Sequence, residues 1–383
     1  MQSTAHRAQA LRMQGALAVL RHVHAHPGVT RAELTRALGL SSGSAAEITA
    51  RLKVLRLVEE TEAPATGGRG RPSPVLTAHP DGPVICAVDI GHESWRVATV
   101  ELGGRLVGDV SGRHADRAAG AVLDAVRHRI PQADRRLRAV SVAVAGSVQG
   151  TRVVQAATLG WRDVDLAVLR PDPGVPLLVG NDASLAGLAE ARRGAGFDTK
   201  VVLHLTVEVG LGGILVVDGR PMTGATGAGG EFGHLPFGDR ERQCPCGARG
   251  CWDLEVDGRA MARDLGLPEP RDPRTEADRI LRSADAAHRA AVRRVATTLG
   301  RGIGGLVNAL DPDLVTLSGL ARSLLAEVPE ALHAGYADGL MSFRRAEPPP
   351  LRPSTLGDQG PVIGAAEVAF DALLTEEGLA AWE

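Results

Sequence analysis

The sequence predicts an α/β protein in two parts: a winged helix-turn-helix unit at residues 1–80, and a larger mixed α/β body with two lobes at residues 81–383. Helical periodicity with cap and turn signals fills the first part, and alternating strand and helix signals fill the second. The net charge changes from positive to negative at the same boundary. Residues 1–80 hold ten basic and five acidic side chains, and the rest hold 33 and 40. A basic head suggests a polyanionic partner.

Composition excludes several classes of protein. Of 383 residues, 44% are hydrophobic and 23% charged, which is typical of a folded protein and not of a disordered one. Aromatic residues make up only 3%, which argues against a binder that stacks single-stranded bases. The sequence has no long apolar run and no secretory signal. We therefore expect a cytoplasmic protein.

The first helix of the head is predicted by apolar residues at helical spacing, and it ends near Ala25 because Pro27 and Gly28 follow. Thr30 and Glu33 then form a capping box that starts a short second helix. The buried stripe of the first helix comprises Ala10, Met13, Ala16, Leu17, Leu20 and Val23.

A helix-turn-helix pattern follows. Gly39 ends the second helix in a left-handed turn, and Ser41 or Ser42 caps a third helix. In such a unit the third helix enters the major groove of DNA. The alternative is a three-helix module that docks another protein. The residues expected to contact DNA are Ser42, Ser44, Glu47 and Arg51.

Two predicted strands, at 57–60 and 75–77, form a wing behind these helices. Between them, the Arg-Gly-Arg-Pro run at 69–72 resembles an AT-hook. Arg69 and Arg71 are therefore expected to enter the narrow minor groove of A·T tracts. A glycine- and proline-rich linker is the alternative.

The body is predicted as strands alternating with helices. We expect strands at 84–89, 96–101, 106–110, 140–144, 177–179, 201–207, 210–217 and 314–317, and helices at 117–130, 182–192 and 285–309. The proline- and charge-rich segment 267–284 is expected to be an exposed connection.

One histidine and three cysteines are spaced like metal ligands. His234 is followed by Cys244, Cys246 and Cys251, which lie within eight residues. This donor set suits tetrahedral Zn²⁺, and four protein ligands leave no position for a catalytic water, so we expect a structural zinc knuckle at 234–251. The alternative is three unliganded thiols. Cys86, within a strand, is expected to be a buried residue and no ligand.

The chain resembles the ROK family (repressor, open reading frame, kinase). The resemblance rests on Gly-Glu-x-Gly-His at 230–234, Cys-x-Cys-Gly-x-x-Gly-Cys at 244–251, Asn-Asp-Ala at 181–183, Asp-Pro-Asp-Leu-Val at 311–315 and Gly-Ala-Ala at 364–366. It implies an actin-like body of two ribonuclease-H-like lobes with a sugar in the cleft. The head resembles the winged helix of the family's regulators.

The resemblance also implies roles for single residues. Asn181 and Asp182 match the pair that holds sugar hydroxyls, and Glu231 matches an acceptor of a sugar hydroxyl. His234 matches a residue that contacts the sugar and binds zinc through its other ring nitrogen. Asp253 stands where the family usually has Glu. Either Asp253 makes no contact with the sugar, or the contact runs through a water molecule, or the bound ligand is a different one.

The phosphate-binding turns depart from the family's kinases. At 89–94 and 208–213, Glu93 and Glu208 stand where the kinases have hydroxyls, and both carboxylates oppose a triphosphate. Alternatively, Glu93 and Glu208 help to hold Mg²⁺. We therefore expect that the chain has no catalytic residue. We expect it to be a repressor of carbohydrate-utilisation genes. Its operator affinity would be controlled by a sugar or sugar phosphate, and it would act as a homodimer or homotetramer with structural zinc. The alternative is an ATP-dependent sugar kinase of hexokinase type that also binds DNA, with Asp182 as the base.

Overall fold

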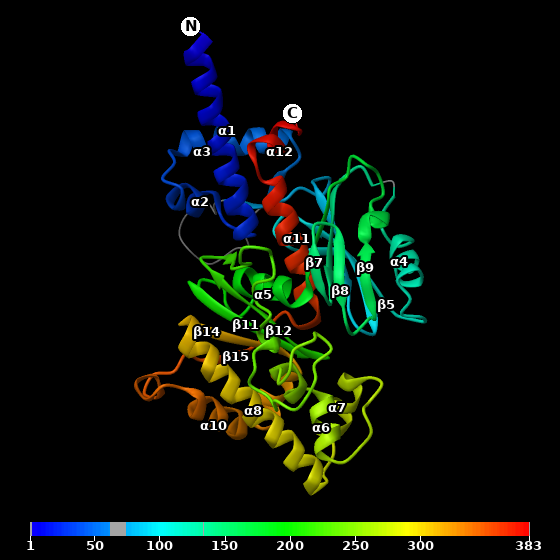
Figure 1. The fold of residues 1–383 in the computed structure, drawn as a ribbon. Helices are drawn as coiled ribbons and strands as arrows, with labels where there is room; N and C mark the ends of the chain where they lie inside the picture. The colour runs from blue at the N-terminus through cyan, green and yellow to red at the C-terminus, as the bar shows by residue number, and fades with distance from the viewer. Residues whose placement is uncertain (1, 62–73, 133, 383) are drawn as a thin grey trace.

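The computed structural model describes residues 2–61, 74–132 and 134–382. The head stands at one end of the molecule, with three helices and a two-stranded antiparallel wing (Figure 1). Arg69 and Arg71 lie outside the described residues, so their minor-groove role stays a prediction. The elements of the head are α1 (Gln2–Ala25), α2 (Arg31–Ala37), α3 (Ser42–Val54), β1 (Val58–Thr61) and β2 (Val75–Ala78).

The local signals of the head act as predicted. The Thr30 hydroxyl accepts from the Glu33 amide at 3.2 Å, and the Glu33 carboxylate accepts from the Thr30 amide at 2.9 Å, which completes the capping box. Gly39 has a φ of 61° and follows α2. Ser41 is the residue that caps α3, and its hydroxyl accepts from the Ser44 amide at 3.1 Å.

The first lobe is a five-stranded sheet in the order β10-β6-β3-β4-β5. β3 pairs antiparallel with β4, and β4 with β5, whereas β3, β6 and β10 run parallel. Its strands are β3 (Val84–Ile90), β4 (Ser94–Glu101), β5 (Leu106–Arg113), β6 (Leu137–Val144) and β10 (Leu177–Asn181), with α4 (Ala119–Arg127) beside them and a small sheet of β7 (Ser147–Gln149), β8 (Arg152–Ala156) and β9 (Trp161–Asp165).

The second lobe repeats this strand arrangement in the order β13-β12-β11-β14-β15. Its antiparallel hairpins again lie on one side and its parallel strands on the other. The repetition confirms the expected pair of ribonuclease-H-like lobes. Its strands are β11 (Val201–Glu208), β12 (Gly210–Val217), β13 (Arg220–Pro221), β14 (Leu314–Gly319) and β15 (Leu351–Pro353).

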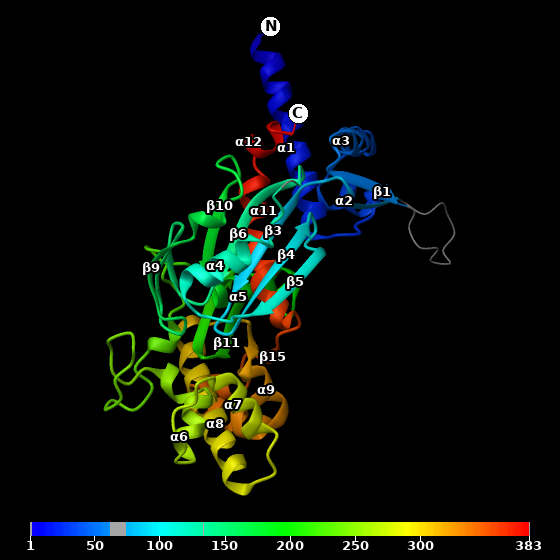
Figure 2. The same ribbon diagram turned by 90° about the vertical axis from the view of Figure 1, so that its right-hand side faces the viewer.

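Two central helices connect the lobes. α5 (Asp182–Arg193) packs on β11 and β12, α11 (Gly360–Leu373) packs on β3 and β6, and the two helices pack on each other (Figure 1). The remaining helices of the second lobe gather at the end far from the head (Figure 2). They are α6 (Gly258–Asp264), α7 (Pro273–Leu281), α8 (Ala286–Leu310), α9 (Leu320–Glu327) and α10 (Pro329–Gly339).

The head and the body share one hydrophobic core. Leu17 and Leu20 of α1 belong to the same buried cluster as Phe370 and Leu374 at the end of α11 and Leu379 of α12 (Glu376–Ala380). The head is therefore packed against the body and is not merely tethered to it.

The segment 267–284 was predicted wrongly as an exposed connection. It contains α7, which Asp272 caps by accepting from the Thr275 amide at 3.0 Å, and which buries Ala277 and Ile280. The three strands β7 to β9 were not predicted either. Within the described residues, no helix is long and apolar enough to cross a membrane.

Candidate functional site

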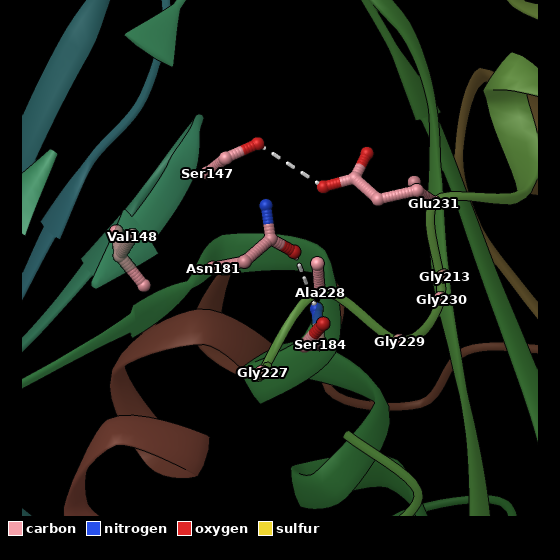
Figure 3. Close-up of a pocket in the computed structure, with 11 residues that line it drawn as sticks. Ser147, Val148, Asn181, Ser184, Gly213, Gly227, Ala228, Gly229, Gly230 and Glu231 are labelled. Carbon is pink, nitrogen blue, oxygen red and sulfur yellow. Dashed lines mark hydrogen bonds between the residues drawn. The ribbon is translucent and has the colours of Figure 1, made fainter. Parts of the chain in front are cut away.

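A pocket opens between the small sheet, the N-terminal end of α5 and a glycine-rich loop (Figure 3). The Ser147 hydroxyl and the Glu231 carboxylate face each other across it, with Ser147 Oγ 3.2 Å from Glu231 Oε1. Predicted residues Asn181 and Glu231 both line it. The full lining comprises Ser147, Val148, Asn181, Ser184, Gly212, Gly213, Gly227, Ala228, Gly229, Gly230 and Glu231.

Asn181 and Asp182 are held by the start of α5. Asn181 Oδ1 accepts from the Ser184 amide at 2.9 Å as the N-cap, while its Nδ2 donates to the Gly146 carbonyl at 3.3 Å and to Asp182 Oδ1 at 3.2 Å. Burial raises the pKa of Asp182, and the negative charge of Glu231 raises it further. The pocket thus offers oriented amide and carboxylate groups, which suit sugar hydroxyls.

A further acid lies behind this pair at the end of β3. Asp89 Oδ1 is enclosed and has no hydrogen-bond partner among the described residues. Burial raises the pKa of Asp89 to about 8, and the charge of Asp182 adds to the rise against the opposing effect of Arg96. The electrostatic environment of this side of the cleft is therefore acidic.

The predicted histidine and cysteines come together in space. The ligand atoms of His234, Cys244, Cys246 and Cys251 all lie within 4.8 Å of one another. Gly247 and Gly250, with φ of 99° and 72°, make the tight turns that bring the thiols together. His234 Nδ1 lies 3.8 Å from Cys244 Sγ, and Nε2 on its other side lies 3.7 Å from Glu231 Oε2.

This cluster has the chemistry and spacing of a zinc site. A tetrahedral zinc ion with Zn–S distances of about 2.3 Å separates its sulfur ligands by about 3.8 Å. Cys246 Sγ lies 3.7 Å from Cys251 Sγ. Thiolate and imidazole ligands favour zinc over magnesium or calcium, which prefer oxygen. The cluster can therefore hold a metal ion of the zinc type.

The second phosphate turn of the resemblance, at 208–213, has its amides already bonded. The Gly210 amide donates to Asp257 Oδ2 at 3.0 Å, and the Leu211 amide donates to Asp253 Oδ1 at 2.6 Å. Arg259 pairs with both carboxylates. Backbone amides that already donate to carboxylates are poor donors to a phosphate, and the nearby negative charges add repulsion.

The negative charges of the two glutamates in the turns are compensated by arginines that the sequence analysis did not identify. Glu93 pairs with Arg113 at 3.2 Å and with Arg117. Glu208 pairs with Arg274 of α7 at 3.1 Å. Their charges are therefore partly neutralised.

Several residues of this region carried no signal in the sequence analysis. Asp257, Arg259 and Arg274 approach the turn from distant segments, and only the N-cap pattern of Asp257 before α6 could have marked one of them. Asp253, expected near the sugar, has its carboxylate on Leu211 and Arg259 instead. Its contact with a sugar stays a prediction.

The residues expected to contact DNA lie on α3, at the opposite end of the molecule from α8 (Figure 1). Ser42, Ser44 and Glu47 are exposed, and Arg51 is half-buried. The Ser44 hydroxyl lies 2.8 Å from that of Ser41, so it serves the cap of the helix as well. Lys53, two residues after Arg51, pairs with Glu60 of the wing at 3.1 Å.

Comparisons with known proteins agree with this architecture. A model of the ROK family matches residues 85–372, and a model of the MarR family matches residues 12–70. The xylose repressor of Bacillus subtilis (strain 168) is 22% identical over 369 residues, covering 93% of this chain and 94% of that protein. A crystal structure of a ROK family transcriptional regulator, a homolog of the E. coli MLC protein, has a TM-score of 0.75 at 21% identity, covering 97% of this chain and 98% of that one. The ROK hexokinase from Thermus thermophilus has a TM-score of 0.61 at 29% identity, covering 76% and 99%.

Proposed function

The chain belongs to the ROK family, and from this premise we propose that it is a transcriptional regulator whose operator affinity depends on a sugar bound in the pocket. The observation that carries the proposal is that one chain joins a helix-turn-helix head to a sugar-kinase-like body. A repressor aligns with 93% of this chain, so it shares both parts. Repression of carbohydrate-utilisation genes is the role we propose.

The proposed DNA-binding surface is the outward face of α3, with Ser42, Ser44, Glu47 and Arg51. Two heads of a homodimer would occupy successive major grooves of a palindromic operator, about 10 base pairs apart or a multiple of that. Such a protein works in the cytoplasm, where its operator is.

The proposed effector is an uncharged sugar. The described residues that line the pocket include no lysine, arginine or histidine, whereas Glu231 lines it and Asp182 and Asp89 lie close behind. A phosphate group placed beside the Glu231 carboxylate would be repelled without a compensating cation. D-xylose and D-glucose are the first sugars to test, because relatives are named for xylose repression and glucose phosphorylation.

We propose Zn²⁺ as the metal of the His234 cluster. The ion would hold His234 through Nδ1, so that Nε2 stays directed at Glu231 beside the pocket. The metal then has two effects: it stabilises the knuckle, and it orients the His234 imidazole towards Glu231, which lines the pocket.

Loss of kinase activity is part of the proposal, and the bonded amides of Gly210 and Leu211 support it. The competing function is a sugar kinase, which Asp182 favours because a buried carboxylate beside a sugar hydroxyl can act as a base. That function predicts ATP-dependent phosphorylation that disappears in Asp182→Asn.

Fluorescence anisotropy tests the proposal with DNA from upstream of the protein's own gene, titrated with D-xylose, D-glucose and their phosphate esters. We expect specific binding that one free sugar changes and that the phosphate esters leave unaltered. Glu47→Ala should weaken binding about 5- to 100-fold if Glu47 reads a base, and Glu330→Ala, exposed on α10, should not. Absence of specific binding, together with ATP-dependent sugar phosphorylation, would replace the regulator by the kinase.

A further inference from the structure

A buried charged cluster occupies the junction between head and body. Glu367 of α11 is 1% exposed and lies at its centre. Its Oε1 accepts from Arg193 Nε at 2.8 Å, and its Oε2 accepts from Arg192 Nη1 at 3.3 Å. His24 Nε2, from α1, lies 3.3 Å from the same Oε1. The cluster therefore joins three helices, α1, α5 and α11, around one carboxylate.

The end of α1 is fixed by the same side chains. Arg193 Nη1 donates to the carbonyls of His24 at 2.6 Å and Ala25 at 3.3 Å, which belong to the last turn of the helix and have no partner within it. A positive charge at this position is also favourable for the helix dipole. The Gly103 amide donates to His24 Nδ1 at 3.0 Å, which fixes the ring with Nε2 facing Glu367 at 3.3 Å.

The helix that ends at Arg193 begins at the pocket. Asn181 is the N-cap of α5, Asp182 is its first residue, and Ser184 lines the pocket. Twelve residues separate the sugar-facing end from the head-facing end, a length of about 18 Å. One continuous helix therefore touches both the proposed effector site and the proposed DNA-binding unit.

α5 and α11 are packed too closely to slide independently. A Cβ atom on Gly364 of α11 would lie 1.9 Å from the Leu185 carbonyl oxygen of α5, and one on Gly360 would lie 3.2 Å from the Ala186 Cβ. On the opposite side, a Cβ on Gly187 would lie 2.3 Å from Ile214 of β12. Close-packed interiors transmit displacement instead of absorbing it.

We propose that α5 transmits sugar binding to the head, with Arg193 and Glu367 as the positioning residues that couple its end to α1. The inference rests on the proposed function and extends it by assigning its regulation. A sugar that draws Asn181 and Asp182 towards it shifts α5, and the cluster carries the shift to α1 and so to the spacing of the two heads. The coupling requires that the sugar bind the two arrangements with different affinity.

The test measures the coupling ratio, defined as the operator Kd with saturating sugar divided by the Kd without it, in the full chain. The sugars are D-xylose and D-glucose. Arg193→Lys keeps the charge but loses the forked donor set, and Glu367→Gln keeps the shape. We expect each to leave the sugar Kd within about threefold and to lower the coupling ratio at least tenfold. The matched controls are Arg301→Lys, at an exposed position of α8, and Glu330→Gln, at an exposed position of α10, and both should keep the wild-type ratio.

The outcomes separate this inference from the proposed function. A wild-type chain with no sugar response refutes the proposed function itself. A responding wild type whose Arg193→Lys and Glu367→Gln variants keep its ratio refutes the coupling role alone. Should the variants fail to fold, amide hydrogen exchange on the wild-type chain decides the matter. We expect the sugar to change protection in the last turns of α1, and unchanged protection there would overturn the inference.

Discussion

Cys246→Ser tests the metal centre with little disturbance of the fold. Cys246 is exposed, and among the described residues its sulfur accepts from the Ala248 amide at 3.5 Å and otherwise meets the neighbouring thiols. Without a metal, the change is a surface substitution expected to cost at most about 0.5 kcal/mol. With zinc, it removes one of four ligands, and the effect becomes much larger.

The magnitude follows from the number of ligands. Structural zinc binding contributes about 10–16 kcal/mol in small zinc-dependent units. One ligand in four then accounts for about 3–4 kcal/mol, which corresponds to zinc binding weaker by about two to three orders of magnitude. Because His234 shares the ion, we also expect the sugar response to fall.

The assay is zinc content by mass spectrometry after dialysis against a graded series of chelators, together with thermal unfolding. Cys86→Ala is the control, since Cys86 is a buried cysteine of β3 outside the cluster, and it should keep its full zinc content. Equal zinc retention by Cys246→Ser and the wild type would refute the assignment of Cys246 as a ligand. Loss of zinc with an unchanged sugar response would leave the metal a purely structural role.

Three further predictions concern the helices and the acidic cleft. Gly364→Ala should cost about 1–3 kcal/mol in urea unfolding because the added Cβ meets the Leu185 carbonyl, whereas Gly120→Ala, with open space in α4, should be neutral or stabilising. Asn181→Ala should lower the free energy of unfolding by about 1 kcal/mol because the cap of α5 is lost. It should also weaken sugar binding, measured by calorimetry, at least about tenfold. Asp89 has a pKa raised to about 8, above its ordinary value of 3.8, so its ionisation lowers stability as pH rises between these values. Asp89→Asn should therefore be more stable than wild type by up to about 5 kcal/mol at pH 8, from about 1.4 kcal/mol per pKa unit, and equal to it near pH 4. Equal melting temperatures at both pH values would contradict the burial argument.

Short-range signals explain what could be predicted from the sequence. The Thr30 and Glu33 capping box, the Gly39 turn and the Cys244 to Cys251 knuckle each depend on residues a few positions apart, and the structure contains all three. Apolar runs placed the inner strands β3, β6, β11, β12 and β14 to within a few residues, because these strands are largely buried. The short strands β13 and β15 and the central helix α11 were not predicted.

Long-range contacts explain what could not be predicted. The Gly210 amide meets Asp257, and Glu208 meets Arg274, only after separate helices have packed on the second lobe. α7 was missed because it presents only a short apolar stripe within a proline- and charge-rich sequence. The role of Asp253 depends on the direction of its side chain, which spacing alone does not determine.

The shared core of head and body has a consequence for biosynthesis. Arg21 of α1 donates to the Leu374 carbonyl at 2.6 Å, and Trp382 stacks under Arg138 with 4.3 Å between the guanidinium and the ring, so the last residues of the chain lie beside the first helix (Figures 1 and 2). On the ribosome residues 1–80 emerge before the body, whereas the residues that complete their core, Phe370, Leu374 and Leu379, emerge after most of it. A nascent chain therefore leaves the core of residues 1–80 unfinished until the segment around Phe370 to Leu379 has been translated, so the head cannot complete its packing before the body is made.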